Sequence, residues 1–446
     1  MNYTLKIKKI VPHILKCSLS LTITLSTTNL MAQKPVVTLE KLWQEAMVNS
    51  QEIKVNQMQL TEAEQQILSA KNPTLPEVDF NLSMGYLGNG YLTDRNFKNG
   101  MSVENPHFMN NFSIKASQLI YGGGVVKNAI KMAQKGRDIA QLNLEASQQD
   151  LKMMIAGYYL DLCRLHNQTA VLDDNLQLCD IVIANMKVMQ QQGTALSNDI
   201  LRYELQKESL LLSKRKIQDA LQIVYRKIAT VTHHDGQNDF IPDTTLINNI
   251  IDFQTDSTWQ HLALNGNTFV KITEANSQLN EYQLKTTQSN NLPKVVLIAE
   301  EHFDGPITIE VPVIDKNFNY WFAGVGIQYS LSSIYKNKCE VKRAEIALKT
   351  SQEQQTLARE NIGDNAYAAY TDLLTSDAET LTQQKSVELA GKNYNVILSR
   401  YNNGLSTITD MLDAANTKLD AELGLVNSKI NVLYNYFKLK YICADL

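Results

Sequence analysis

The chain has 446 residues, of which 44% are hydrophobic and 20% charged, and a formal net charge of −4. No run of about 18 uninterrupted apolar residues occurs, which excludes a polytopic helical membrane protein. Lys and Arg (42) do not outnumber Asp and Glu (46), so no positive charge is available in excess for binding nucleic acid. Only 19 Gly and 9 Pro interrupt the chain, which indicates long helices.

The N-terminal segment has the composition of a secretory signal peptide. Lys6, Lys8, Lys9 and Lys16 precede a short apolar stretch diluted by Ser and Thr, and Ala32 supplies a small residue for cleavage. We therefore predict a signal peptide over 1–32. Its removal takes the formal charge of the chain from −4 to −8, because it carries four lysines and no acid.

The rest of the chain is a tandem duplication. One ungapped displacement of 211 positions holds from about residue 112 to 230. The matched pairs include Tyr159 and Tyr370, Asp161 and Asp372, Leu162 and Leu373, Gly193 and Gly404, and Asp199 and Asp410. We divide the mature chain into a first repeat (33–232), a linker (233–267) and a second repeat (268–446). The linker follows neither helical nor strand periodicity.

Each repeat contains a long helix and a returning helix. A heptad seam of period 3.5 predicts a coiled-coil helix over 125–192. The seam residues are Leu151, Ile155, Tyr158, Leu162, Leu165, Thr169, Leu172, Leu176, Cys179, Ile183 and Met186. Gly193 ends this helix and a second one returns over 197–230; in the second repeat Gly404 separates helices predicted over 337–403 and 408–441. We expect these two glycines at the hairpin tips.

Two amphipathic strands precede each long helix. Apolar and polar residues alternate over 76–86, 112–121 and 320–331, whereas 294–303 alternates poorly. The pattern alone fits ordinary half-buried hairpins equally well. Loops rich in Asn and Gly separate the strands, and no other apolar segment is available to cover them, which favours membrane strands. Tyr320 and Trp321 fit either an interfacial aromatic girdle or a buried aromatic pair.

Four strands cannot close a membrane barrel. The smallest barrels have eight strands, and an open sheet edge in lipid leaves backbone groups unpaired. Strands in a membrane would therefore require an oligomer, and three chains would supply twelve strands. The fold class that follows is mainly α, with long coiled-coil hairpins, a small transmembrane β part and an internal duplication.

This arrangement resembles the TolC family of outer-membrane efflux proteins over about 39–441. The most specific match is the tip motif Tyr401, Gly404, Asp410, Leu412, Asp413 and Ala414. The resemblance implies a homotrimer with a twelve-stranded barrel in outer-membrane lipid and a periplasmic helical tunnel of about 100 Å. It further implies docking on a periplasmic adaptor and an inner-membrane transporter, in efflux or type I secretion, with no cofactor and no enzymatic activity.

The resemblance also implies a gate at the tips. Tyr401 and Asp199 match a Tyr–Asp hydrogen bond that holds the two hairpins together in the family. The family's gate arginine falls at Ser406, so this chain lacks that half of the lock.

Asp410 and Asp413 match the family's two acidic rings at the aperture. Six carboxylates near one axis would raise one another's pKa values and favour a bound cation, which predicts cation block. The alternative is that both acids merely complement the dipole of a helix in its first turn.

Other chemistry is weakly supported. His233, His234 and Asp235 form no metal-ligand spacing with a further partner. Cys163 and Cys179 lie 16 residues, about 24 Å, apart on one helix and are predicted as core thiols. Two functions remain: an export duct, and a soluble periplasmic coiled-coil adaptor or scaffold. The adaptor has no need of four amphipathic strands, which favours the duct.

Overall fold

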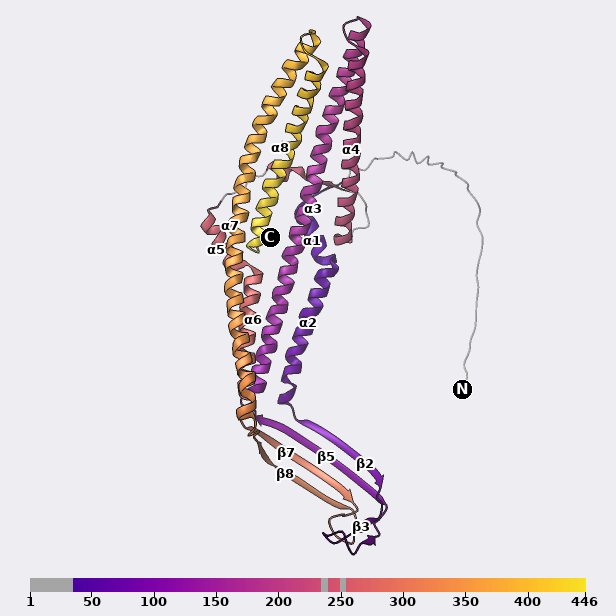
Figure 1. The fold of residues 1–446 in the computed structure, drawn as a ribbon, viewed down its shortest axis with the longest axis vertical. Helices are drawn as coiled ribbons and strands as arrows, with labels where there is room; N and C mark the ends of the chain where they lie inside the picture. Colours follow the sequence, from indigo (N-terminus) through magenta and orange to yellow (C-terminus); the bar gives the residue numbers. More distant parts are fainter. Residues whose placement is uncertain (1–34, 234–239, 249–253) are drawn as a thin grey trace, which may run out of the picture.

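The computed structural model describes residues 35–233, 240–248 and 254–446. The chain is elongated, with a long helical body and a small β-sheet at one end (Figure 1). The predicted signal peptide lies outside the described residues. None of the helices in the described ranges combines the length and the apolar character that a membrane crossing requires.

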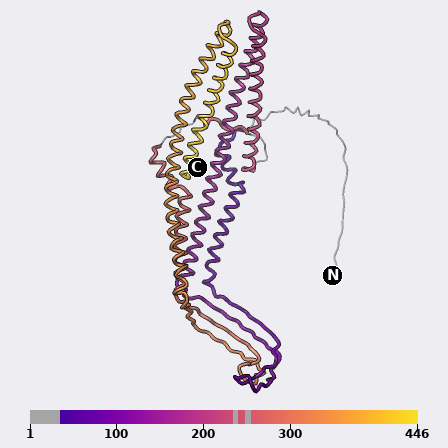
Figure 2. The backbone as a smooth tube through the Cα atoms, viewed as in Figure 1, coloured from indigo at the N-terminus to yellow at the C-terminus, as the bar shows by residue number. Residues whose placement is uncertain are grey.

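Two long helices form the axis of the body. Helix α3 (Val125–Gln191) has 67 residues and α7 (Ser333–Asn402) has 70, so each is roughly 100 Å long. Each packs against one short helix near the sheet and another near the opposite end: α2 (Gln51–Lys71) and α4 (Ser197–Thr232) on α3, and α6 (Thr268–Ser289) and α8 (Ile408–Ile442) on α7 (Figures 1 and 2). The two repeats join because α3 also contacts α6 and α8.

The heptad seam of α3 explains this packing. Most seam positions, including Leu151, Leu162 and Met186, are buried against neighbouring helices. The buried positions of α7 are small by comparison, with Ala366 and Ala369 at the centre of its core. Small side chains let α7 and α8 approach closely without the apolar signal of a leucine seam.

The sheet has four antiparallel strands in the order β2 (Glu77–Tyr86), β5 (Phe108–Tyr121), β7 (Lys294–Gly305) and β8 (Phe318–Gln328). Strand β5 begins before the expected residue 112, and β8 ends before the expected residue 331. A small hairpin, β3 (Gly90–Leu92) and β4 (Met101–Val103), extends the loop between β2 and β5. The outer edges of β2 and β8 have no strand partner within the described chain.

The sheet has one apolar and one polar face. The cross-strand register places Phe80, Ile114 and Trp321 on the apolar face, where Glu301 is a charged exception. Tyr320 lies on the polar face and stacks on His302, with ring centroids 4.9 Å apart. Tyr320 and Trp321 therefore point to opposite faces, and the buried aromatic pair considered from the sequence is wrong.

Four helices were not anticipated from periodicity: α1 (Leu39–Asn49), α2, α5 (Asp256–Gly266) and α6. Helix α5 lies inside the linker that showed no period; its stability comes from packing Trp259 and Ala263 on α7 and α8. Helices α2 and α6 are mostly polar and bury few side chains, so their hydrophobic periodicity is weak.

A two-stranded parallel pair, β1 (Val36–Val37) and β6 (Ile241–Pro242), is held against α3 by Tyr159. The buried hydroxyl of Tyr159 donates to the Val37 carbonyl (2.9 Å) and accepts from the Asp243 backbone N–H (2.8 Å). Burial raises the pKa of Tyr159, so the hydroxyl remains a donor at neutral pH.

We expect Tyr159→Phe to destabilise the protein by about 1 kcal/mol, because it removes both bonds of the hydroxyl and leaves the Val37 carbonyl and the Asp243 N–H only their 3.3 Å bond to one another. The thermal unfolding midpoint of the detergent-solubilised protein measures this effect. Tyr370→Phe is the matched control, since its hydroxyl forms no hydrogen bond among the described residues. Equal midpoints for the two variants would contradict the role of Tyr159.

Candidate gate at the hairpin tips

The two helical hairpins end far from the sheet (Figure 1). We call α3 with α4 hairpin 1, and α7 with α8 hairpin 2. Gly193 and Gly404 lie in their turns with φ of 77° and 73°, a left-handed conformation that favours glycine. One shared tip core joins the hairpins. It consists of Leu172, Leu176, Cys179, Val182, Ile183, Met186, Ile200, Tyr203, Leu210, Tyr394, Tyr401, Ile408, Met411 and Ala414.

The structure brings Tyr401 and Asp199 together across the two hairpins. Tyr401 is the last buried residue of α7 and is only 6% exposed, while Asp199 lies in the first turn of α4. Burial raises the pKa of Tyr401, and the charge of Asp199 and a hydrogen bond to its carboxylate raise it further. The protonated hydroxyl of Tyr401 therefore lies beside the Asp199 carboxylate and can donate to it.

A second contact between the hairpins, a buried pair of tyrosines, was not predicted. Tyr203 on α4 is 1% exposed and shares a hydrogen bond with Tyr394 on α7. Burial raises the pKa of both groups. Their heptad-like positions read as ordinary core residues in the sequence, and only the pairing of the two hairpins shows that their hydroxyls meet.

Asp410 caps its own helix. Its carboxylate accepts hydrogen bonds from the Thr407 backbone N–H (2.8 Å), the Thr407 hydroxyl (2.8 Å) and the Ser406 hydroxyl (3.2 Å). The Asp410 N–H donates back to Thr407 Oγ1, which completes a capping box. These bonds, led by the one from the Thr407 backbone, lower the pKa of Asp410. Asp413 lies one turn further along α8 and is exposed. Within one chain, Asp410 thus performs the helix-terminal role that was the alternative to an acidic ring.

Hairpin 1 is reinforced by three ion pairs between its own helices. Each joins α3 to α4 along their exposed sides: Lys187 with Glu204 (3.1 Å), Asp180 with Lys207, and Asp173 with Lys214. In the described part of hairpin 2, the ion pair between α7 and α8 is Asp372 with Lys438 (3.0 Å), far from the tip.

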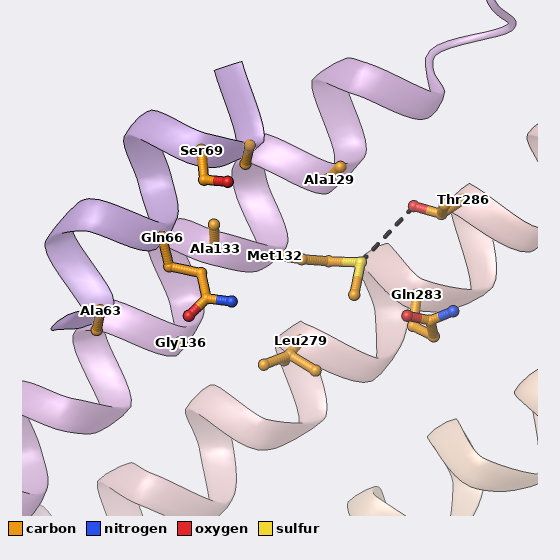
Figure 3. Close-up of a pocket in the computed structure, with 11 residues that line it drawn as sticks. Ala63, Gln66, Ser69, Ala129, Met132, Ala133, Gly136, Leu279, Gln283 and Thr286 are labelled. Carbon is orange, nitrogen blue, oxygen red and sulfur yellow. Dashed lines mark hydrogen bonds between the residues drawn. The ribbon is translucent and has the colours of Figure 1, made fainter. Parts of the chain in front are cut away.

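A groove of about 600 Å³ lies between α2, α3 and α6, nearer the sheet (Figure 3). Its lining is uncharged and includes several small residues, such as Ala63, Ala133 and Gly136. The Thr286 hydroxyl donates to the sulfur of Met132 at 3.7 Å. No ionisable side chain lines the groove, so it offers no catalytic chemistry.

The described residues hold no cluster of three or more His, Cys, Asp or Glu arranged for a metal ion. His233 ends α4, while His234 and Asp235 lie outside the described residues. Cys163 and Cys179 are buried, and burial raises the pKa of each, to about 12 and about 11. Such thiols are unreactive core residues, as predicted.

The polar face of the sheet carries charges in register across two strands. Lys115 on β5 pairs with Glu300 on β7 at 2.9 Å, and His302 contacts the same carboxylate at 3.3 Å. The Asn111 amide donates to Asp304 at 2.6 Å. A polar face opposite an exposed apolar face matches strands that separate an aqueous lumen from lipid.

A body of long helical hairpins joined to an amphipathic four-stranded sheet is the architecture of outer-membrane efflux channels. VceC, an outer membrane protein of Vibrio cholerae, superposes with a TM-score of 0.74 at 15% identity, covering 91% of this chain and 96% of that chain. The channel CusC gives a TM-score of 0.75 at 13% identity, covering 91% of each chain. These likenesses show the fold.

Sequence comparison supplies the family. The sequence profile described as "Outer membrane efflux protein" matches residues 42–222 and 259–441, one segment in each half of the chain. Outer membrane protein TolC of Salmonella enteritidis is 21% identical over 458 residues, which cover 99% of this chain and 87% of that protein. The chain belongs to the outer membrane efflux protein family.

The family membership confirms several predictions. The protein is a passive exit duct of the outer membrane that extends into the periplasm, and it is not an enzyme. The predicted fold class is also confirmed. A soluble periplasmic adaptor or scaffold is not favoured.

Proposed function

We propose that three copies of this chain form the duct, with twelve strands in one closed barrel and the hairpins in one tunnel. The unpaired outer edges of β2 and β8 support this arrangement. In the order β2, β5, β7, β8 the two edge strands run in opposite directions, so β8 of one copy can pair antiparallel with β2 of the next. Closure leaves no edge exposed to lipid.

The helices support the same closure. Backbone contacts in the tip half follow the order α4, α3, α8, α7. Side chains of α4 reach α7 and α8 close to the turns, so α4 and α7 are the outer helices away from the turns. Each carries exposed apolar residues at near-heptad spacing. These are Leu201, Leu205, Leu212 and Ile223 on α4, and Tyr367, Leu374, Leu381, Leu389 and Val396 on α7. Packing α7 of one copy against α4 of the next would bury both stripes.

The double variant Leu374→Asp with Leu381→Asp should strongly weaken trimer formation, because it places six charges in three helical interfaces. Cross-linking and size-exclusion chromatography of detergent-extracted outer membranes measure the trimer fraction, which we expect to fall at least about tenfold given 1.5–3 kcal/mol per buried leucine. Thr375→Asp, exposed on another side of α7, is the control. A trimer fraction equal to wild type in the double variant would refute this interface.

The tips provide a docking site for the other members of a tripartite system, a periplasmic adaptor and an inner-membrane transporter. Leu196 and Leu405, at the two hairpin turns, are exposed at 69% and 68%. Exposed leucines at the ends of coiled coils suit a helical partner that buries them.

Tyr401 and Asp199 form the gate at these tips. Their hydrogen bond joins hairpin 2 to hairpin 1, so moving hairpin 2 away from hairpin 1 must break it. The shared tip core supports this closed arrangement, since it buries residues from all four helices.

Tyr401→Phe removes the hydroxyl and keeps the ring in the tip core. A hydrogen bond to a charged group contributes about 1.5–3 kcal/mol, so we expect channel open probability to rise about tenfold or more. Planar-bilayer recording measures the opening, and uptake of a large antibiotic reports it in cells. Tyr434→Phe, an exposed tyrosine remote from the tip, is the control. Unchanged opening in Tyr401→Phe would refute the gate.

Asp410 and Asp413 would form two acidic rings in a trimer and bind a blocking cation. The capping hydrogen bonds counter the mutual repulsion of these rings, because they stabilise the ionised form of Asp410. A single chain does not need a complete metal site, since the trimer would place Asp410 and Asp413 of all three copies around the symmetry axis.

We expect Asp410→Asn with Asp413→Asn to abolish divalent-cation block in planar bilayers, while Asp420→Asn leaves it intact. The capping bonds lower the pKa of Asp410 from its ordinary value of 3.8, so the contribution of Asp410 to block should be present above that pH and be lost as pH falls through the lowered pKa. Block that persists in the double variant would contradict the acidic rings.

A further inference from the structure

Four residues on one face of α4 reach across to hairpin 2. Asp199, Arg202, Tyr203 and Gln206 follow the spacing i, i+3, i+4, i+7, which places them on one side of the helix. Two of them, Asp199 and Tyr203, meet Tyr401 and Tyr394 on α7. The remaining two face α8.

The contacts to α8 are direct hydrogen bonds. Arg202 Nη1 donates to Thr409 Oγ1 at 2.9 Å, and Gln206 Nε2 donates to Asn416 Oδ1 at 2.7 Å. Thr409 and Asn416 are seven residues apart on α8, just as Tyr394 and Tyr401 are seven apart on α7. The four contacts therefore form two rows, which we call rails. The α7 rail joins Asp199 and Tyr203 to Tyr401 and Tyr394, and the α8 rail joins Arg202 and Gln206 to Thr409 and Asn416.

The other polar side chains of the hairpin 2 turn are engaged within that turn. The Ser406 hydroxyl donates to Asp410, and Arg400 Nη2 donates to the Leu405 carbonyl at 3.3 Å. Within the described chain Ser406 thus forms no hydrogen bond to hairpin 1, and Arg202 is the arginine that crosses between the hairpins.

We propose that Arg202 and Gln206 on α4, with Thr409 and Asn416 on α8, form a second closing element of the gate. This α8 rail supplies from hairpin 1 the guanidinium that hairpin 2 lacks at Ser406. The proposal rests on the gate proposed at Tyr401 and Asp199, and it deepens that gate with four further positioning residues. Opening requires both rails to separate, because hairpin 2 cannot move as a unit while either rail is intact.

Planar-bilayer recording of the full-length trimer tests the rail with Arg202→Met, Thr409→Val and the double variant. We expect each single variant to raise the open-to-closed ratio about tenfold, the size of one hydrogen bond involving a charged group. The double variant should match the singles, because both remove the same bond. Gln206→Leu should add a further, smaller increase.

Glu204→Gln is the matched control, because Glu204 lies between the rail residues on α4 yet pairs with Lys187 inside hairpin 1. Arg202 and Thr409 are exposed, and trimer yield in detergent checks that each variant assembles. Additive effects of Arg202→Met and Thr409→Val would overturn the rail, as would a wild-type open-to-closed ratio in both. If Tyr401→Phe opens the channel while Arg202→Met does not, the rail alone fails; if neither opens it, the proposed gate fails as well.

Discussion

Unpaired backbone on the two outer strands is the constraint on which the architecture depends. A lipid bilayer supplies no hydrogen-bond partner for the free N–H and C=O groups on β2 and β8, and each unsatisfied group would cost several kcal/mol. One chain has no further strand in its described residues to cover these edges. Assembly is therefore a requirement of the sheet itself, and the helical body has to be compatible with the symmetry that closes it.

The internal duplication meets that requirement. Contacts near the sheet follow the order α2, α3, α6, α7, and strands β2, β5, β7, β8 precede or follow these helices in the same sequence. A rotation that joins β8 to the next β2 therefore also brings α7 beside the next α2 and α4. In the proposed trimer, sheet and helices close by one operation, so a strand added to or removed from one repeat would break the match with the helical tunnel.

The sequence predicted the features that depend on long periodic patterns. The leucine-rich seam of α3 and the glycines at 193 and 404 defined the hairpins without further information. Helices α2 and α6 were not predicted, because nearly all their side chains are at least partly exposed in one chain. Their sequences therefore lack the alternation of apolar and polar positions that reveals a helix. The strand at 294–305 was obscured by Glu300 and Glu301, which point to opposite faces of the sheet.

The residues of the candidate gate likewise fall into those that the sequence predicted and those that only the structure revealed. Tyr401, Asp199, Asp410 and Asp413 came from a tip motif whose residues are close in sequence or matched by the repeat. The partners of Tyr203, Tyr394 and Arg202 lie about 190 to 210 positions away in the sequence. The i, i+3, i+4, i+7 spacing on α4 is the same whether that helix face contacts another helix or solvent. Only the relative rotation of the two hairpins distinguishes these cases.

The uneven distribution of ion pairs between the hairpins has a mechanical consequence. Three charge pairs resist sliding of α3 against α4, whereas α7 and α8 are joined by Asp372 and Lys438 at the end remote from the turn. Each exposed pair contributes little alone, about 0–1 kcal/mol, but three in series oppose shear together. The ion pairs thus link α3 to α4 close to the turn of hairpin 1, whereas side-chain packing holds α7 to α8 near the turn of hairpin 2. Although the two repeats share one architecture, the two helices of each hairpin are therefore held together near the turn by different interactions.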